Sequence, residues 1–336
     1  MPQITYKTVA RRSGKDIMLF RLVNRSGAYV EVSNYGAALV SVVVPDRKGC
    51  FENVVLHYPD MEDYFNDTCY LGSTIGRFAN RIGNAQFTLN GKTFHLDRND
   101  GDNCNHSGYS GFHQKIFDAE VQGDELALTA HSPDGEGGFP GNMKVTVCFS
   151  FRNHVLTIRY RVFADRETLF NPSCHAYFNL SGQKGSAFQH ELHVNASEYL
   201  EADSHFLPTG KILPVTGTTF DFTQYRIIEQ MAALKHDALK GYNAYYPVPG
   251  NDTVRRLASL RESGSGRAMT VCSSMPGVLF YSGDYLCGKY QPFEGLCLEA
   301  QFFPDTPHHA HFPSCTILPG KQIEHVICFQ FEILSM

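Results

Sequence analysis

The stretch KVTVCFSFRNHVLTIRYRVF, residues 144–163, decides the fold class of this chain. Two runs rich in β-branched and aromatic residues flank Asn153-His154, and each run alternates apolar with polar side chains over much of its length. Such alternation is typical of a strand with one buried face, and a two-residue link requires the two strands to run antiparallel. The stretch therefore predicts two long antiparallel strands joined by a tight turn.

Short runs of the same kind recur along the chain, separated by turn residues rather than by helices. Asn90-Gly91 marks a clear example, because this dipeptide supplies the positive φ angles that a two-residue hairpin turn needs. It predicts a hairpin of Phe87–Leu89 with Thr93–Leu96. The other predicted strands are Tyr29–Val32, Ala38–Val44, Leu126–Thr129, Glu191–Val194, Met269–Cys272, Val278–Tyr281, Leu296–Ala300 and Val326–Ile333.

Helical periodicity is weak, and its best stretch, Ile227–Lys240, is short. No repeat, low-complexity linker or shift in composition divides the chain. Although 336 residues would suit two domains by length, large β sandwiches often reach this size as one unit. Many strands without intervening helices favour antiparallel sheets over a parallel α/β sheet. We therefore expect an all-β sandwich with few short helices, in which residues 1–336 form a single domain.

Composition and charge exclude several classes of partner. Hydrophobic residues make up 43% of the chain and charged residues 19%, the net charge is −5, and no block of Lys and Arg occurs. Nucleic acids and anionic membrane surfaces bind such blocks, so neither is expected as a partner.

No window reaches the ~18 apolar residues of a spanning helix, and residues 1–15 lack the apolar segment of a secretion signal. The ten cysteines include no Cys-x-x-Cys pair, and several lie in apolar runs, which predicts buried free thiols and a cytoplasmic protein.

Two segments carry side chains suited to proton transfer. Asn171–Leu180, NPSCHAYFNL, places His175 and Tyr177 in a β-like stretch directly after a strand. In Leu296–Asp305, Glu299 lies in a strongly apolar strand, where burial would raise the pKa of its carboxyl group. Each residue also has a purely structural interpretation: His175 as a core histidine bonded to a neighbouring carbonyl, and Glu299 as a strand-edge residue facing solvent.

Two further polar segments are suited to binding hydroxyl groups. Gly76–Ile82, GRFANRI, contains Asn80 and Arg81, and the polar loop Asn103–Gly108, NCNHSG, contains His106. Taken alone, the first segment is better explained by a solvated loop with one structural salt bridge.

Taken together and in this order, these segments make the sequence resemble the aldose 1-epimerase, or mutarotase, family. The resemblance extends over nearly the whole chain, and this many motifs in one order do not match by chance. The matching segments are Asn34–Ala37, Leu71–Ile82, the hairpin Phe87–Leu96, His106 with Gly111-Phe112, Asn171–Leu180, Leu207–Gly210, Phe220–Phe222, Pro276–Val278 and Leu298–Asp305.

The resemblance implies a fold and a reaction. The family fold is a large antiparallel β supersandwich, galactose mutarotase-like, with an open cleft. By resemblance, His175 donates a proton to the ring oxygen of an aldose and Glu299 removes one from the C1 hydroxyl. The ring then opens, C1 turns about its bond to C2, and the ring recloses as the other anomer. The residues implied to hold the sugar are Asn80, Arg81, His106, Tyr177 and Asn243.

This reaction needs an acid and a base that are both tuned near neutral pH. It requires no cofactor and no metal, because proton transfer alone opens a hemiacetal. The expected partner is a small-molecule sugar of the glucose or galactose type, and the chain is expected to act as a monomer or a homodimer.

The sequence departs from the family pattern at two single positions and at one pair of residues. Asn243 stands where an Asp usually follows Gly-Tyr, so a charged hydrogen-bond acceptor is replaced by an amide. Leu279 replaces a Gln that usually follows Pro-Gly-Val, and His113-Gln114 replaces an Asp-Lys pair. None of these touches the implied acid or base, and the first two bear on which sugar is bound.

Several alternatives stay open. The same chemistry could act on a modified, phosphorylated or oligomeric sugar, and the cleft could bind carbohydrate without catalysis. A zinc site at His308, His309 and His311 is disfavoured, because this cluster follows Pro304–Pro307 in a loop without further ligands positioned by secondary structure. No metal site is therefore predicted.

Overall fold

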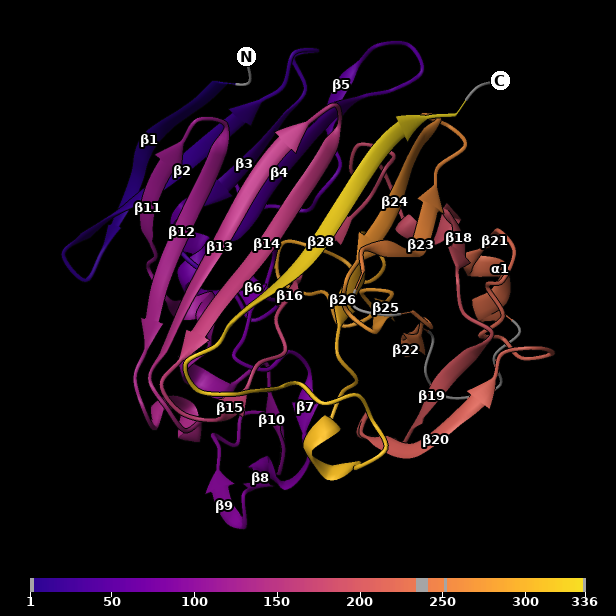
Figure 1. Ribbon diagram of the computed structural model, residues 1–336. Coiled ribbons are helices and arrows are strands. Elements are labelled where there is room, and N and C mark those ends of the chain that lie inside the picture. The colour runs from indigo at the N-terminus through magenta and orange to yellow at the C-terminus, as the bar shows by residue number, and fades with distance from the viewer. Residues whose placement is uncertain (1–2, 234–240, 251–252, 335–336) are drawn as a thin grey trace.

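The computed structural model describes residues 3–233, 241–250 and 253–334. Its largest element is an antiparallel sheet of nine strands, which forms one broad layer of the molecule (Figure 1). From edge to edge the sheet consists of β11 (Asp118–Gln122), β12 (Glu125–Ser132), β13 (Met143–Arg152), β14 (Val155–Ala164), β28 (Gln322–Ile333), β24 (Arg267–Ser273), β23 (Arg255–Arg261), β18 (Glu191–Val194) and β21 (Arg226–Ile227).

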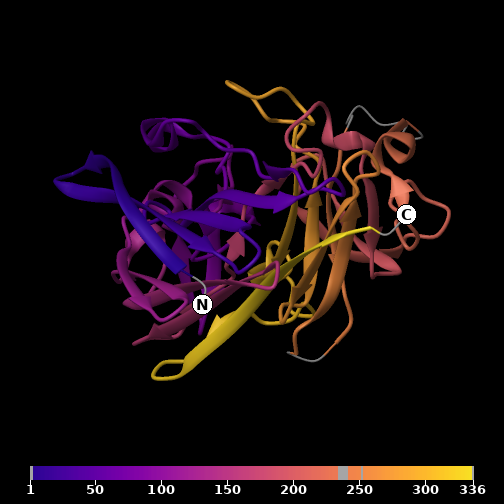
Figure 2. The same cartoon turned by 90° about the horizontal axis from the view of Figure 1, so that it is seen from above.

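Two smaller antiparallel sheets form the second layer, one behind each half of the large sheet (Figures 1 and 2). The five-stranded sheet contacts β13 through β2, and the four-stranded sheet contacts β24 and β23 through β26 and β25. The five-stranded sheet consists of β1 (Gln3–Arg12), β2 (Lys15–Val23), β3 (Tyr29–Ser33), β4 (Ala38–Pro45) and β5 (Phe51–Asn53), and the four-stranded sheet of β17 (Tyr177–Phe178), β26 (Leu296–Gln301), β25 (Gly277–Tyr281) and β22 (Asn243–Pro247).

Short strand pairs and helical turns connect the layers. The pairs are β6 (Thr74–Ile75) with β16 (Ser173–Cys174), β7 (Arg81–Ile82) with β10 (Cys104–Asn105), β8 (Gln86–Leu89) with β9 (Lys92–His95), β15 (Thr168–Leu169) with β27 (Thr316–Ile317), and β19 (Glu198–Ala202) with β20 (Pro208–Pro214). The helical elements are α1 (Ile228–Ala233) and the 3₁₀ turns η1 (Met61–Asn66), η2 (Gly83–Ala85), η3 (Gly108–Ser110), η4 (Phe112–Gln114), η5 (Glu136–Gly138), η6 (Ala187–Gln189) and η7 (Thr306–His308).

One hydrophobic core fills the space between the layers. It joins buried side chains of all three sheets, among them Val30 of β3, Val147 of β13 and Leu298 of β26. Two apolar faces thus remove each other from water, which is the stable arrangement for sheets with one apolar face. The predicted all-β sandwich is confirmed.

The stretch at residues 144–163 forms the centre of the large sheet. β13 and β14 pair antiparallel, with Arg152 opposite Val155. The two turn residues, Asn153 and His154, have φ angles of 49° and 61°, as a two-residue hairpin turn requires. Along β14 the core face carries Leu156, Ile158, Tyr160, Val162 and Ala164.

The other predicted strands are also present, with ends shifted by a few residues. The Asn90-Gly91 turn joins β8 to β9, with φ angles of 51° and 74°. Of the predicted helical stretch Ile227–Lys240, Ile227 belongs to β21 and α1 covers Ile228–Ala233, while residues 234–240 lie outside the described part of the chain.

Among the strands of five residues or more, the sequence patterns did not predict β1, β2, β11, β19, β20, β22 and β23. β1 has no fully buried side chain and β20 has one, so neither shows the apolar alternation by which strands are recognised. β23 is buried on consecutive residues from Leu257 to Leu260, which removes the alternation in the opposite way.

The ten cysteines are all free thiols, as predicted, although Cys50 and Cys287 are exposed and Cys272 and Cys328 are only partly buried. Among the residues that the structure describes, no helix has the length and apolar character needed to cross a lipid bilayer.

Candidate active site

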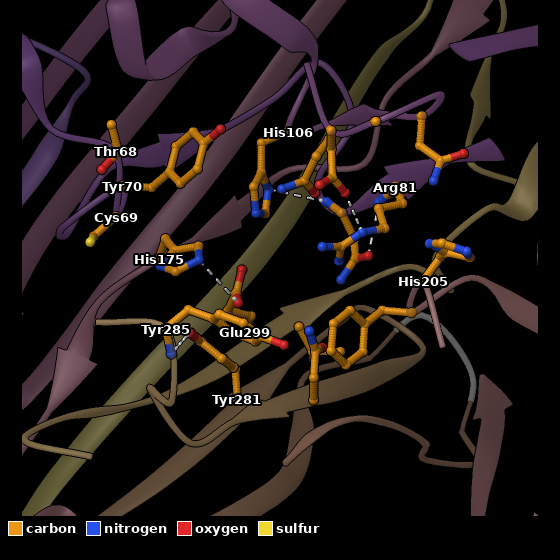
Figure 3. A pocket seen from close by; sticks show the side chains of 18 of the residues that line it. Thr68, Cys69, Tyr70, Arg81, His106, His175, His205, Tyr281, Tyr285 and Glu299 are labelled. Atoms are coloured by element: carbon orange, nitrogen blue, oxygen red, sulfur yellow. Dashed lines mark hydrogen bonds and ion pairs between the residues drawn. The ribbon is translucent and has the colours of Figure 1, made fainter. Parts of the chain in front are cut away.

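A pocket of about 430 Å³ lies over one face of the four-stranded sheet. Its walls come from the loop before β6, from β7 and β10, from the link between β16 and β17, from the β19–β20 turn, and from β22, β25 and β26. Segments far apart in the sequence therefore meet at one cavity. Most of the side chains that line it are polar or aromatic (Figure 3).

His175 and Glu299 face each other in this pocket (Figure 3). Nε2 of His175 lies 3.7 Å from Oε1 of Glu299, and the two residues are 5% and 1% exposed. The other carboxylate oxygen, Oε2, is buried without a hydrogen-bond partner among the described residues. The alternative that Glu299 faces solvent from a strand edge is wrong, because β26 is an inner strand of its sheet.

The backbone around both residues is firmly held. The N–H of His175 donates to the carbonyl of Ser73, and its carbonyl accepts from the N–H of Gly72. Glu299 stands opposite Leu279 in the pairing of β26 with β25. Glu299 thus lies on a paired strand, which holds a side chain more precisely than a loop does, and His175 lies in a short link whose backbone is hydrogen-bonded on both sides.

Burial shifts the pKa values of His175 and Glu299 in the directions that favour their neutral forms. It lowers the pKa of His175 to about 4, although a hydrogen bond to the residue's own backbone opposes this shift. It also raises the pKa of Glu299 to about 8. Between these values the pair holds a single proton, which can reside on either residue because the two groups are so close.

His106, Asn80 and Arg81 also line the pocket, and in Figure 3 His106 and Arg81 lie across from Glu299. The backbone N–H of Asn80 donates to Nδ1 of His106 over 3.2 Å, so Nδ1 is the acceptor nitrogen and Nε2 carries the proton. Burial lowers the pKa of His106 well below its usual value, which keeps the ring neutral. Arg81 donates to Asp100 over 2.7 Å and remains 14% exposed.

The other two predicted sugar-binding residues also line the pocket. Asn243 begins β22 at the pocket wall, two strands away from Glu299. Tyr177 contributes its ring, since its hydroxyl donates to the carbonyl of Cys69 over 3.1 Å. Leu279, where the resemblance led us to expect a Gln, presents an apolar side chain between them.

Four aromatic residues of the pocket were not predicted from the sequence. Tyr70 stacks near His106 and His175, with ring centroids 4.7 and 5.8 Å away. Phe206 lies in the β19–β20 turn with the guanidinium of Arg81 5.1 Å from its ring centre. The others are Tyr281 and Tyr285. Tyr70 and Phe206 directly precede segments that match the family, so adjacency to a motif was the available signal.

His113-Gln114 lies behind the pocket rather than in it. The His113 ring packs 4.9 Å from that of Tyr70, and burial lowers the pKa of His113 to about 4. Gln114 accepts a hydrogen bond from the hydroxyl of Tyr35. This departure from the family pattern therefore supports the pocket wall and does not contact its contents.

His308 and His311, two members of the histidine cluster at 308–311, contact polar groups of the fold. His308 contacts Asp305 through Nδ1, and His311 contacts the carbonyl of Gly210 through Nε2. In the described part of the chain, one group has metal-binding atoms within 4.8 Å of one another, and it is His175, Cys297 and Glu299. A metal ion there would occupy the atoms that proton transfer needs.

Known proteins are similar to this chain in both sequence and fold. A family model described as aldose 1-epimerase matches residues 18–330. Galactose mutarotase from Bos taurus is 34% identical over 313 residues, 90% of this chain and 91% of that protein. Aldose 1-epimerase from Escherichia coli is 32% identical over 332 residues, 95% of this chain and 96% of that protein.

Solved structures agree. Galactose 1-epimerase from Lactobacillus acidophilus has a TM-score of 0.88 at 28% identity, with 100% of both chains covered. An aldose epimerase homologue from C. elegans has a TM-score of 0.90 at 24% identity, covering 94% of this chain and 99% of that one, and supports the fold. Because the family model and relatives above 30% identity extend over most of its length, this chain belongs to the aldose 1-epimerase family.

Proposed function

We propose that this protein is an isomerase that interconverts the α and β anomers of a free aldose, such as glucose or galactose. The observation that carries the proposal is the acid–base pair in the pocket, with Nε2 of His175 3.7 Å from the Glu299 carboxylate. Family membership supports the same reaction, because its relatives include galactose mutarotases and aldose 1-epimerases.

The reaction proceeds by two proton transfers. In the reacting form, the shared proton resides on Nε2 of His175, and Glu299 is charged. The carboxylate removes the proton of the C1 hydroxyl while Nε2–H protonates the ring oxygen, and the bond between C1 and that oxygen breaks. C1 of the aldehyde turns about its bond to C2, both transfers reverse, and the ring closes on the other face.

The surrounding groups fit these transfers. Oε2 of Glu299, which has no hydrogen-bond partner in the described part of the chain, offers a buried lone pair to the C1 hydroxyl. The Nε2–H of His106 and the guanidinium of Arg81 donate to sugar oxygens and stabilise negative charge that develops on them. The aromatic rings of Tyr70 and Tyr281 exclude water from the reacting atoms.

The test is the optical rotation of freshly dissolved α-D-galactose and α-D-glucose, with and without the protein. We expect a faster approach to the same final rotation. Glu299→Gln should stay folded and lose nearly all of this acceleration, a drop of roughly 10²–10⁴-fold, because the amide cannot accept the proton. Glu324→Gln, on an exposed carboxylate paired with Arg161, is the matched control and should retain full activity.

Wild-type turnover by Glu299→Gln would refute the assigned base. Acceleration with neither sugar would direct the search to other aldoses, because Asn243 and Leu279 change the polarity of the sugar-binding wall. A panel of pentoses, deoxy sugars, sugar phosphates and disaccharides then identifies the substrate. Binding of a sugar without faster anomer exchange would establish the non-catalytic alternative.

We also propose that the protein acts in the cytoplasm, as a monomer or homodimer without a macromolecular partner. Its ten unpaired cysteines support a reducing compartment.

A further inference from the structure

The imidazole ring of His175 contacts two side chains of the same strand. Cys297 and Glu299 are two residues apart on β26, so they point to the same face of the sheet. Sγ of Cys297 lies 3.6 Å from Nδ1 of His175, and Oε1 of Glu299 lies 3.7 Å from Nε2. Each ring nitrogen therefore has its own neighbour on β26.

We propose that Cys297 is a positioning residue whose sulfur accepts a hydrogen bond from Nδ1–H of His175. This bond keeps the neutral ring in the Nδ1–H form and leaves Nε2 as the nitrogen that gains and loses the proton. The role of this hydrogen bond in catalysis rests on the proposed function. The Nδ1–H form of His175 can be tested without it.

The direction of the hydrogen bond follows from where the exchanged proton has to go. Nε2 faces Glu299 and the pocket, whereas Nδ1 faces a cysteine that is fully buried. An acid that donates from Nε2 becomes neutral with its remaining proton on Nδ1. That proton needs an acceptor, and among the described residues the side chain that offers one to Nδ1 is Cys297, through its sulfur.

His106 provides the contrast within the same pocket. There the neighbour of Nδ1 is the backbone N–H of Asn80, which can only donate, so His106 is held in the Nε2–H form. His106 can donate to a sugar oxygen but has no free lone pair at the pocket. The two histidines, 5.3 Å apart between ring centroids, are thus set to opposite tautomers, and His175 alone is prepared to exchange a proton.

A thiol has a specific electrostatic advantage at this position. Burial raises the pKa of Cys297 well above its usual value, so the group is neutral. It orients the ring as a carboxylate orients histidine in Ser-His-Asp triads, but adds no second negative charge beside Glu299. A charged residue there would favour the imidazolium and raise the pKa of His175.

Nitrogen-15 NMR of the whole protein with labelled histidine tests the tautomer directly. His175 and His106 are assigned with His175→Gln and His106→Gln, and long-range proton–nitrogen spectra near pH 6 identify the protonated nitrogen of each ring. We expect Nδ1–H at His175 and Nε2–H at His106. Nε2–H at His175 in the wild-type protein would overturn the inference, whether or not the protein proves to be an epimerase.

Kinetics test the consequence. Cys297→Ala should lower kcat about 10-fold with KM within about twofold, because the tautomer changes while sugar contacts remain. Cys297→Ser retains an acceptor and should restore most of kcat. Cys297→Asp should move the acid limb of the pH profile to higher pH. Cys315→Ala, a buried thiol in a different core cluster, is the matched control for the cavity.

Unchanged kcat and an unchanged pH profile in Cys297→Ala would refute the positioning role. Equal loss in Cys297→Ala and Cys315→Ala would also refute it, since a cavity would then explain both. If Cys297→Ala does not fold, the NMR spectra of the wild-type protein and of Cys297→Ser show whether Nδ1 of His175 carries the proton.

Discussion

At the scale of single residues, His175 and Glu299 share one proton over a wide pH range. Below about pH 4 the pair takes up a second proton, on His175. Both residues are then protonated, so Glu299 is no longer available as a base. Above about 8, the pair loses its proton, so no acid remains. The macroscopic values belong to the pair rather than to either residue alone.

We therefore predict a bell-shaped dependence of kcat/KM on pH, with limbs near 4 and 8. The measurement is polarimetry from pH 3.5 to 9, corrected for the uncatalysed rate at each pH. The residual activity of Glu299→Gln should lack the limb near 8, because the amide does not titrate. A profile in the wild-type protein that is flat across this range would contradict the shared-proton assignment.

The residues predicted as acid, base and sugar ligands all line one pocket. Except for Asn243, which departs from the family pattern, each lies in a segment that resembles the family, and this resemblance made them predictable. Cys297 lies in one of these motifs as well, but its sequence neighbours give no sign of a role. Its position matters only because the β16–β17 link brings His175 beside it. Likewise Phe206 becomes a pocket residue only because the β19–β20 turn reaches Arg81.

At the scale of elements, one buried guanidinium fixes the segment that carries Asn80 and Arg81. Arg77 lies in the link between β6 and β7 and is 2% exposed. It donates to the hydroxyl of Ser132 and to the carbonyls of Ser132, Pro133, Pro140 and Gly141, at 2.7 to 2.9 Å. The connection between β12 and β13 is thereby tied to the wall of the pocket.

Arg77→Met should lower the free energy of unfolding by about 3 kcal/mol or more, because several buried acceptors lose their donor. It should also raise KM more than it lowers kcat, since it loosens sugar-binding residues rather than the acid or base. Denaturant unfolding and polarimetry measure the two effects. Arg166→Met, which removes a half-exposed guanidinium paired with Asp134, should change stability by less than about 0.5 kcal/mol. Equal effects of the two substitutions would contradict the role of Arg77.

Strands were predictable where one face is buried and apolar residues alternate with polar ones, as in β14. They were not predictable where both faces are buried or both are exposed, because the alternation is then absent. β22 is an instructive case, because it carries Asn243 and has three consecutive buried residues, Ala244, Tyr245 and Tyr246. An edge strand packed on both faces has the local sequence of a buried loop or helix turn. Its place beside β25 depends on pairing that no short window contains.

At the scale of the whole molecule, β28 joins the two halves of the large sheet. It pairs with β14 on one side and with β24 on the other, and it crosses the middle of the molecule in Figure 2. The sandwich class was predictable from many amphipathic strands. The strand order was not, because partners such as Val155 and Gln330 lie at distant positions in the sequence.

Ile327→Pro, at a position of β28 that pairs with both neighbours, should lower the free energy of unfolding by about 4 kcal/mol or more. Proline removes a ladder hydrogen bond, and the substitution also deletes part of a fully buried side chain. Gln322→Pro, at the first residue of the strand, should be far milder. Denaturant unfolding measures the stability of both variants. Similar denaturation midpoints for Ile327→Pro and Gln322→Pro would show that the pairing of β28 does not hold the two halves of the sheet together.

The late position of β28 in the sequence has a consequence for biosynthesis. While the ribosome makes the chain, β14 leaves the exit tunnel long before its partner in the sheet has been translated. The facing edges of β14 and β24 therefore remain without backbone partners until residues 322–333 emerge, and unpaired edges are templates for aggregation. The large sheet is completed only when residues 322–333 have been translated, and until then both edges are open to pairing with other chains.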